Sequence, residues 1–98
     1  MSKKSSDSNI IYVGRKPPMN YVLAIVTAFS GAEVKEVTVK ARGQAITTAV
    51  DAVEITRRKF VKEMIVDTVA IGTEEMPPRE GESNSRNIST IEITLKRS

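Results

Sequence analysis

The stretch "VGRKPPMNYVL", residues 13–23, decides the fold, because a strand ends and a helix begins within it. The apolar residues at 10–13 predict a short strand. The two prolines suit the first turn of a helix, where the missing N–H has no intrahelical acceptor to lose. Between these elements stand two adjacent cations, Arg15 and Lys16. Since the amino end of a helix is already partly positive, a cation pair at this junction predicts an anionic ligand.

The rest of the chain alternates between helical and extended patterns. Residues 19–29 are apolar on nearly all sides and predict a helix buried between layers or in a subunit contact. Residues 37–41 alternate as a half-buried strand, and an amphipathic helix follows from 45 to 60. Residues 64–73 and 88–96 predict two strands of a long hairpin arm with an exposed polar tip. The order β-α-β-α-β-β predicts an α/β (α+β) two-layer sandwich with a four-stranded mixed sheet and two helices.

Length and composition limit the classes of protein to which the chain can belong. Its 98 residues predict a disordered tail over 1–9 and a single domain over 10–98. The longest mainly apolar stretch covers 11 positions, whereas a membrane span needs about 20, so no membrane association is expected. No cysteine or histidine is present, which removes disulfides, thiolate metal sites and the usual general base. Asp51 and Glu54 are the remaining acid–base candidates, and they lack a nucleophile or metal cluster. We therefore predict no enzyme activity, no metal and no cofactor.

The charge of the chain is distributed unevenly. Residues 1–62 hold 11 Lys or Arg against 5 Asp or Glu, a net charge of +6, and residues 63–98 hold 4 against 7, a net charge of −3. The alternatives are a mixed, solvated surface and a basic region that binds a polyanion.

A second junction repeats the pattern of the first. In "VKARGQ", residues 39–44, Lys40 and Arg42 lie between a predicted strand and a predicted helix. If the first two strands run parallel, both junctions lie at one edge of the sheet, with four cations and two helix N-termini. Such an edge favours phosphate, although the same cations would also suit a solvated loop. Neither junction has the glycine spacing of a nucleotide-binding loop.

Further cations stand elsewhere in the chain. Four cations crowd the end of the second helix: Arg57, Arg58, Lys59 and Lys62. Cations there complement the helix dipole, and Glu54 can pair with Arg57 or Arg58, which favours a structural role over the alternative of a second polyanion patch. Periodicity alone places Phe60, beside this cluster, in the core. Arg79 and Arg86 stand in the otherwise acidic hairpin, from which arginines can enter a DNA minor groove.

Three stretches together, "VGRKPPMNYVL", "VKARGQAITTAVDAVEI" and "STIEI", resemble the Alba family of archaeal chromatin proteins, with the likeness running from about residue 9 to residue 96. The resemblance implies a small dimer, either a homodimer or a heterodimer with a paralogue. It further implies that the dimer coats and compacts double-stranded DNA with little sequence preference, and that many members also bind RNA. In such a dimer the loop cations contact the backbone and the hairpins extend along the minor groove.

The resemblance assigns roles residue by residue. Arg15 and Lys16 match the basic pair of the first loop, and Arg42 matches the arginine of the second. Gln44 and Thr48 occupy positions that are commonly Arg and often Lys in the family, which implies weaker or less salt-sensitive binding. The possible acetylation site of the first loop is Lys16, because an arginine precedes it. Phe60 matches a position implicated in contact between neighbouring dimers, which favours exposure over burial. These assignments give the candidate nucleic-acid-binding residues as Arg15, Lys16, Lys40, Arg42, Gln44, Arg79 and Arg86.

The predicted function is a dimeric, non-sequence-specific DNA-binding architectural protein, cytoplasmic and associated with the chromosome. An RNA-binding or ribonucleoprotein role is the alternative, because phosphate contacts serve both polymers. A third class is a small-anion or protein-interaction domain.

Overall fold

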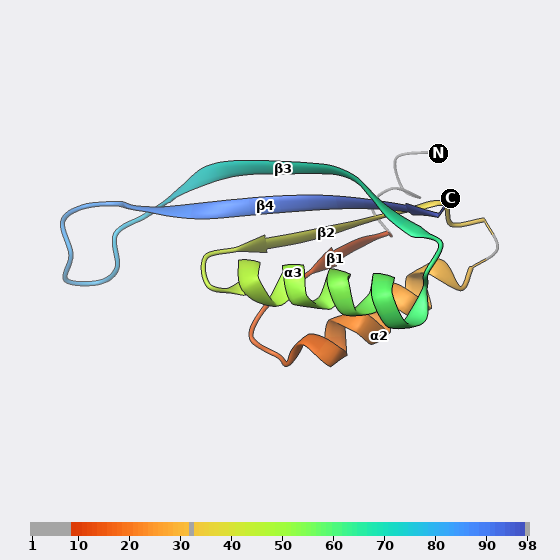
Figure 1. Ribbon diagram of the computed structural model, residues 1–98. Coiled ribbons are helices and arrows are strands. Elements are labelled where there is room, and N and C mark those ends of the chain that lie inside the picture. The colour runs from red at the N-terminus through yellow and green to blue at the C-terminus, as the bar shows by residue number, and fades with distance from the viewer. Residues whose placement is uncertain (1–8, 32, 98) are drawn as a thin grey trace.

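The computed structural model describes residues 9–31 and 33–97, and it confirms the predicted fold class: two helices and a mixed four-stranded sheet in two layers (Figure 1). The sheet order is β1-β2-β4-β3, with β1 and β2 parallel and the other pairs antiparallel. Apart from Asn9, the tail predicted over residues 1–9 lies outside the described residues, and the single domain over 10–98 stays a prediction. The elements are β1 (Ile10–Tyr12), α2 (Pro18–Phe29), β2 (Glu36–Arg42), α3 (Ala45–Ile55), the π-helical turn η1 (Thr56–Phe60), β3 (Met64–Met76) and β4 (Arg86–Arg97).

Both helices pack on the same face of the sheet, and the other face carries no helix (Figure 1). Alternation along β2 and β4 produces this arrangement, because every second side chain points toward the helices. Along β2 these inward side chains are apolar, while the outward ones are charged or hydroxylic. The core between the layers includes Val22, Ile25, Phe29, Val37, Val39, Ala49, Ala52, Ile93 and Leu95.

Helix α2 buries only one side. Tyr21, Val22 and Ile25 face the core, but the side chain of Leu23 is 62% exposed and that of Met19 is also exposed. The predicted burial of this helix between two layers is therefore wrong, because the sheet covers only one side of it, and the alternative of a subunit contact stays a prediction.

Helix α3 ends in a wider turn than the regular pattern predicts. The Thr56 hydroxyl donates to the Ala52 carbonyl at 2.8 Å, and the Val61 N–H donates five residues back to the Thr56 carbonyl. This π-type turn shifts the following residues around the helix axis. Phe60 is consequently 53% exposed, so its prediction as a core residue from periodicity is wrong and the exposure implied by the family resemblance is confirmed.

The hairpin of β3 and β4 extends well beyond the rest of the sheet (Figure 1). The predicted hairpin with an exposed polar tip is present, but its strands extend beyond the predicted ends at 73 and 88, since pairing continues from Glu74↔Ile88 to Met76↔Arg86. Backbone hydrogen bonds sustain the ladder there, even though the side chains are polar. The arm raises the radius of gyration to 14.9 Å, against about 13 Å for a compact domain of this length.

Within the described ranges, no helix is long and apolar enough to cross a membrane. In the same part of the chain, no group of three or more acidic side chains is arranged to hold a metal ion.

Candidate nucleic-acid interface

Parallel pairing of β1 with β2 brings the two cationic junctions to one end of the molecule. Tyr12 lies opposite Lys40, and the Val13 N–H donates to the Lys40 carbonyl at 2.8 Å. The loop after β1 and the loop after β2 therefore leave the sheet at the same edge, and the hairpin arm projects past that edge (Figure 1). The structure thus confirms the predicted convergence of the two loops.

At this edge, neither helix has a capping side chain or an acidic residue to offset the partial positive charge of its amino end. Pro17 precedes α2 and Gln44 precedes α3, and neither residue makes a side-chain capping hydrogen bond. No acidic residue stands in the first turn of either helix. The partial positive charge of each helix terminus therefore adds to the positive charge of the loop side chains.

A tyrosine hydroxyl holds the first loop in place. The backbone N–H of Gly14 donates to the Tyr21 hydroxyl at 2.9 Å, and that of Lys16 donates at 3.2 Å. The ring of Tyr21 is buried, so helix α2 carries the loop on a rigid support. Arg15 and Lys16 remain exposed, with no ion pair within the described residues. In the sequence Tyr21 belongs to the apolar helix pattern, and its position in the first turn of the helix, seven residues after Gly14, is the signal for this second role.

The second loop is arranged differently. Gly43 has a φ of 60°, a left-handed conformation that turns the chain from β2 into α3 and that other residues adopt rarely. Arg42 Nη1 lies 2.7 Å from Glu74 Oε1, and Lys40 Nζ lies 3.5 Å from Glu92 Oε2. Both cations lie within β2 (Glu36–Arg42), so the prediction that they stand between the strand and the helix is wrong, because the strand runs up to the turn at Gly43. Their side chains face the helix-free side of the sheet, with carboxylates beside them. Gln44 is exposed at the start of α3, and Thr48 is half-buried one turn later.

The two arginines of the arm differ in accessibility. Arg79 is exposed near the tip, where its backbone N–H donates to a Glu82 carboxylate oxygen at 3.2 Å. Arg86 is half-buried at the start of β4, and its Nε is shielded without a hydrogen-bond partner in the described part of the chain. Arg79 is thus the more accessible of the two for an external phosphate.

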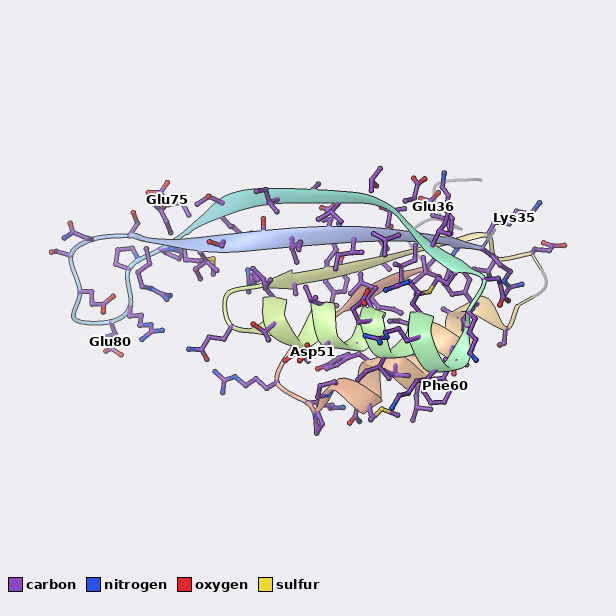
Figure 2. The ribbon with its side chains drawn as sticks, viewed as in Figure 1. Lys35, Glu36, Asp51, Phe60, Glu75 and Glu80 are labelled. Atoms are coloured by element: carbon purple, nitrogen blue, oxygen red, sulfur yellow. The ribbon has the colours of Figure 1, made fainter. Side chains whose placement is uncertain are left out.

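The cluster at the end of the second helix lies away from the loops. Figure 2 places Phe60 at the far end of α3 from the hairpin tip, which Glu80 marks. Two hydrogen bonds join the Arg57 guanidinium to the Glu54 carboxylate, at 2.7 and 3.1 Å. The hydrogen bond from Arg57 lowers the pKa of Glu54, and the charge of Arg58 adds to the effect. The prediction that Glu54 pairs with a neighbouring arginine is confirmed, and Arg57 is the partner.

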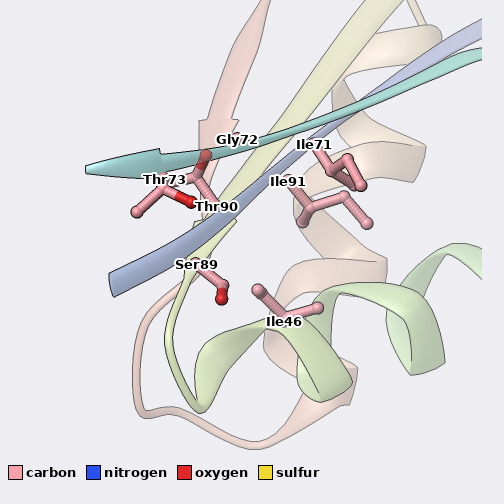
Figure 3. A pocket seen from close by; sticks show the side chains of 7 residues that line it. All are labelled: Ile46, Ile71, Gly72, Thr73, Ser89, Thr90 and Ile91. Atoms are coloured by element: carbon pink, nitrogen blue, oxygen red, sulfur yellow. The ribbon is translucent and has the colours of Figure 1, made fainter. Parts of the chain in front are cut away.

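An apolar surface lies where β3 extends past the helical layer. Val50 on α3 is 42% exposed, Val69 is 55% exposed and Ile71 is 82% exposed. The side chains of Val69 and Ile71 share the helix side of the sheet with Ile93 and Ile91, their partners in β4, but no helix covers them. An open groove between α3 and the hairpin continues this surface (Figure 3), and its lining residues are Ile46, Ile71, Gly72, Thr73, Ser89, Thr90 and Ile91.

Comparison with known proteins identifies the family. The Alba family model matches residues 9–73. The chain belongs to the Alba family. It is 48% identical over 92 residues to the DNA/RNA-binding protein Alba of Picrophilus torridus, covering 94% of this chain and 99% of that protein. It is 50% identical over 91 residues to the protein of the same name from Methanocella arvoryzae, covering 93% of this chain and 92% of that protein.

Solved Alba structures share the fold. The structure of Alba from Thermoplasma volcanium matches with a TM-score of 0.81 and 48% identity, covering 91% of this chain and all of that one. The crystal structure of ALBA1 from Trypanosoma brucei matches with a TM-score of 0.67 and 26% identity, covering 92% of this chain and 69% of that one. The resemblance drawn from the three sequence motifs is therefore confirmed, and both relatives named above are described as DNA/RNA-binding proteins.

Proposed function

We propose that this protein binds double-stranded DNA without sequence preference, as a dimer, and that it coats and compacts the DNA through contacts to backbone phosphates. The observation that carries the proposal is the convergence of two cationic loops and two uncapped helix N-termini at one edge of the sheet. Arg15 and Lys16 lie in the first loop, and Lys40 and Arg42 lie at the end of β2 beside the second loop. Phosphate contacts of this kind position a protein on the duplex without reading its sequence.

The scarcity of aromatic side chains favours backbone contact over base stacking. The chain has two Tyr and two Phe and no Trp. Tyr21 and Phe29 are buried, and Phe60 lies away from the loops. Tyr12 is exposed opposite Lys40, so this edge carries one aromatic ring and not a row of rings on which successive bases could stack. Single-stranded nucleic acid is usually held by exposed aromatic platforms, so a duplex is the better match for this edge.

The apolar surface on β3 and α3 supports dimerisation. Val50, Val69 and Ile71 are exposed there, and a second copy of the same surface is the simplest partner that would cover them in a closed, two-fold assembly. Such a dimer doubles the number of loop cations to at most eight. A homodimer or a heterodimer with a paralogue meets the same physical requirement.

The arms and Phe60 extend the proposed contact with DNA. Each hairpin carries Arg79 and Arg86, which we place along the minor groove, where a narrow groove deepens the negative potential. Phe60 is exposed at the opposite end of α3 and is placed in contact between neighbouring dimers on the same duplex.

Two positions lower the expected affinity of this chain. Gln44 and Thr48 stand where the family commonly has a cation, so each protomer contributes two fewer positive charges.

Lys16 is exposed and is the proposed acetylation acceptor of the first loop, because acetylation needs an amine and Arg15 has none. We place the protein in the cytoplasm, associated with the chromosome.

RNA is the second candidate ligand, because the names of the relatives, DNA/RNA-binding proteins, include RNA beside DNA. The experiment is a competition between duplex DNA and structured RNA of equal length at one salt concentration, with sizing of the free protein. We expect duplex DNA to compete more strongly, and preference for RNA would support the second candidate. A monomer that binds neither polymer would instead indicate a small-anion or protein-interaction domain.

A matched pair of variants tests the loops in the same assay. Changing Arg15 and Lys16 together to Ala should weaken binding to every duplex about equally. Changing Arg58 and Lys59 to Ala removes the same charge from the far end of α3 and should weaken binding less. Loss confined to one DNA sequence would indicate base reading and contradict the proposal.

A further inference from the structure

The two cations at the end of β2, which lead into the second loop, already pair with carboxylates of their own chain. Arg42 Nη1 donates to Glu74 Oε1 at 2.7 Å and to Met76 Sδ at 3.8 Å. Lys40 Nζ lies 3.5 Å from Glu92 Oε2. The first loop differs, since its two cations have no ion pair in the part of the chain that the structure describes.

The register of the sheet produces these pairs. Lys40 lies directly opposite Glu92, so their side chains meet on the helix-free face. Arg42 lies opposite Thr90, which in turn lies opposite Gly72, and Glu74 follows two residues later on the same face. The residues between Arg42 and Glu74 have a short side chain or none, which leaves the guanidinium a clear path across β4 to the base of the arm.

These pairs are accessible enough to exchange partners. The side chains of Arg42 and Glu74 are 55% and 49% exposed. Exposed ion pairs contribute little net stability, because water solvates both charges and the long side chains lose freedom. A nucleic-acid phosphate is a charged, bidentate acceptor for arginine, as the Glu74 carboxylate is, so the two anions compete for the Nη1 donors of Arg42 and for its positive charge.

We propose that Glu74 competes with nucleic-acid phosphate for Arg42, and that Glu92 competes more weakly for Lys40. This inference rests on the proposed function. The second loop then binds by exchanging an internal carboxylate for a phosphate, while the first loop binds directly. Because Glu74 and Met76 stand at the base of the arm, the exchange also releases the arm from its link to the second loop.

The test is a double-mutant cycle read by affinity for duplex DNA. Glu74→Gln keeps the shape of the side chain and removes the competing charge, and we expect binding to tighten about two- to fivefold per chain, the range typical of an exposed ion pair. Glu92→Gln should have a smaller effect, because its pair is longer. The charge-matched control is Glu36→Gln, at the opposite end of the sheet from the arm (Figure 2). Glu36 lies farther from Arg42, and its substitution should change affinity less than twofold at about 0.15 M salt, where screening is strong.

The decisive comparison repeats Glu74→Gln in an Arg42→Gln background. The gain should disappear there, because no guanidinium remains for the carboxylate to hold. An equal gain from Glu74→Gln and Glu36→Gln, or a gain that persists without Arg42, would overturn the inference and indicate a general charge effect. Failure of the wild-type protein to bind any nucleic acid at low salt would instead overturn the proposed function. Far-ultraviolet circular dichroism of each variant shows that the fold is retained.

Discussion

Ile71 offers the sharpest test of the proposed dimer. Its side chain is 82% exposed on β3, on the helix side of the sheet, where no helix covers it. Complete burial of an isoleucine side chain stabilises by about 1.5–3 kcal/mol. Covering the exposed fraction in a dimer would therefore contribute about 2 kcal/mol per copy, scaled from the same burial energy.

A two-fold interface contains each residue twice, so the effect of one substitution is doubled. Ile71→Ser removes most of this apolar contribution and should cost about 4 kcal/mol in dimer stability, or roughly a 10³-fold rise in the dissociation constant. Leu23→Ser is the matched control, because Leu23 is 62% exposed but lies on α2, outside the apolar surface.

Sedimentation velocity over a range of protein concentrations measures both dissociation constants. We expect Ile71→Ser to shift the equilibrium to monomer at concentrations where the wild type and Leu23→Ser remain dimeric. A dimer that survives Ile71→Ser unchanged, or one that is lost with Leu23→Ser, would refute the assignment of the interface to β3 and α3.

Three further substitutions address the loop, the helix end and the contact between dimers. Tyr21→Phe removes the acceptor for two loop amides and should cost about 1–2 kcal/mol, which lowers the midpoint of thermal unfolding by roughly 4–8 °C per kcal/mol; DNA affinity should fall with it. Glu54→Gln should destabilise the protein at neutral pH, because Arg57 lowers the pKa of the folded carboxyl and the resulting stabilisation exists only above its unfolded pKa. The difference from wild type should close as pH falls through the lowered folded pKa in urea titrations. Phe60→Ala should leave the affinity of a single dimer for a short duplex unchanged and reduce cooperative binding to a long one.

Each of these predictions has its own control. Tyr12→Phe removes a hydroxyl from an exposed ring and should leave thermal unfolding unchanged; equal effects at Tyr12 and Tyr21 would contradict the loop-anchoring role. A constant stability difference between Glu54→Gln and wild type from neutral pH to pH 3 would contradict the Arg57 pair. Unchanged cooperativity on long DNA would remove Phe60 from the contact between dimers.

Local patterns in the sequence predict most of the fold. Alternation over 37–41 and the Pro-Pro start of α2 depend on neighbouring residues only, and the structure keeps both within a residue or two. The extent of β3 and β4 was not predictable in the same way, because cross-strand backbone hydrogen bonds sustain polar strands that side-chain pattern cannot reveal. Phe60 was misplaced by periodicity because a π-type turn changes the helical repeat where the sequence pattern continues.

The candidate site was predictable in part for a similar reason. The position of Arg15 beside the second loop follows from parallel pairing of the first two strands, which the order of elements already indicates. The links from Arg42 to Glu74 and from Lys40 to Glu92 depend on the registers of three strands, and those registers appear only in the folded sheet. Tyr21 was missed because its ring belongs to the apolar pattern, and only the fold shows where its hydroxyl points.

The salt dependence of duplex DNA affinity tests the central claim most directly, because each phosphate contact by a loop cation releases condensed counterions. If five to eight contacts form per dimer, a plot of log affinity against log salt concentration should have a slope of about −4 to −7. A slope near zero would contradict the proposal that the converging cationic loops bind the phosphate backbone.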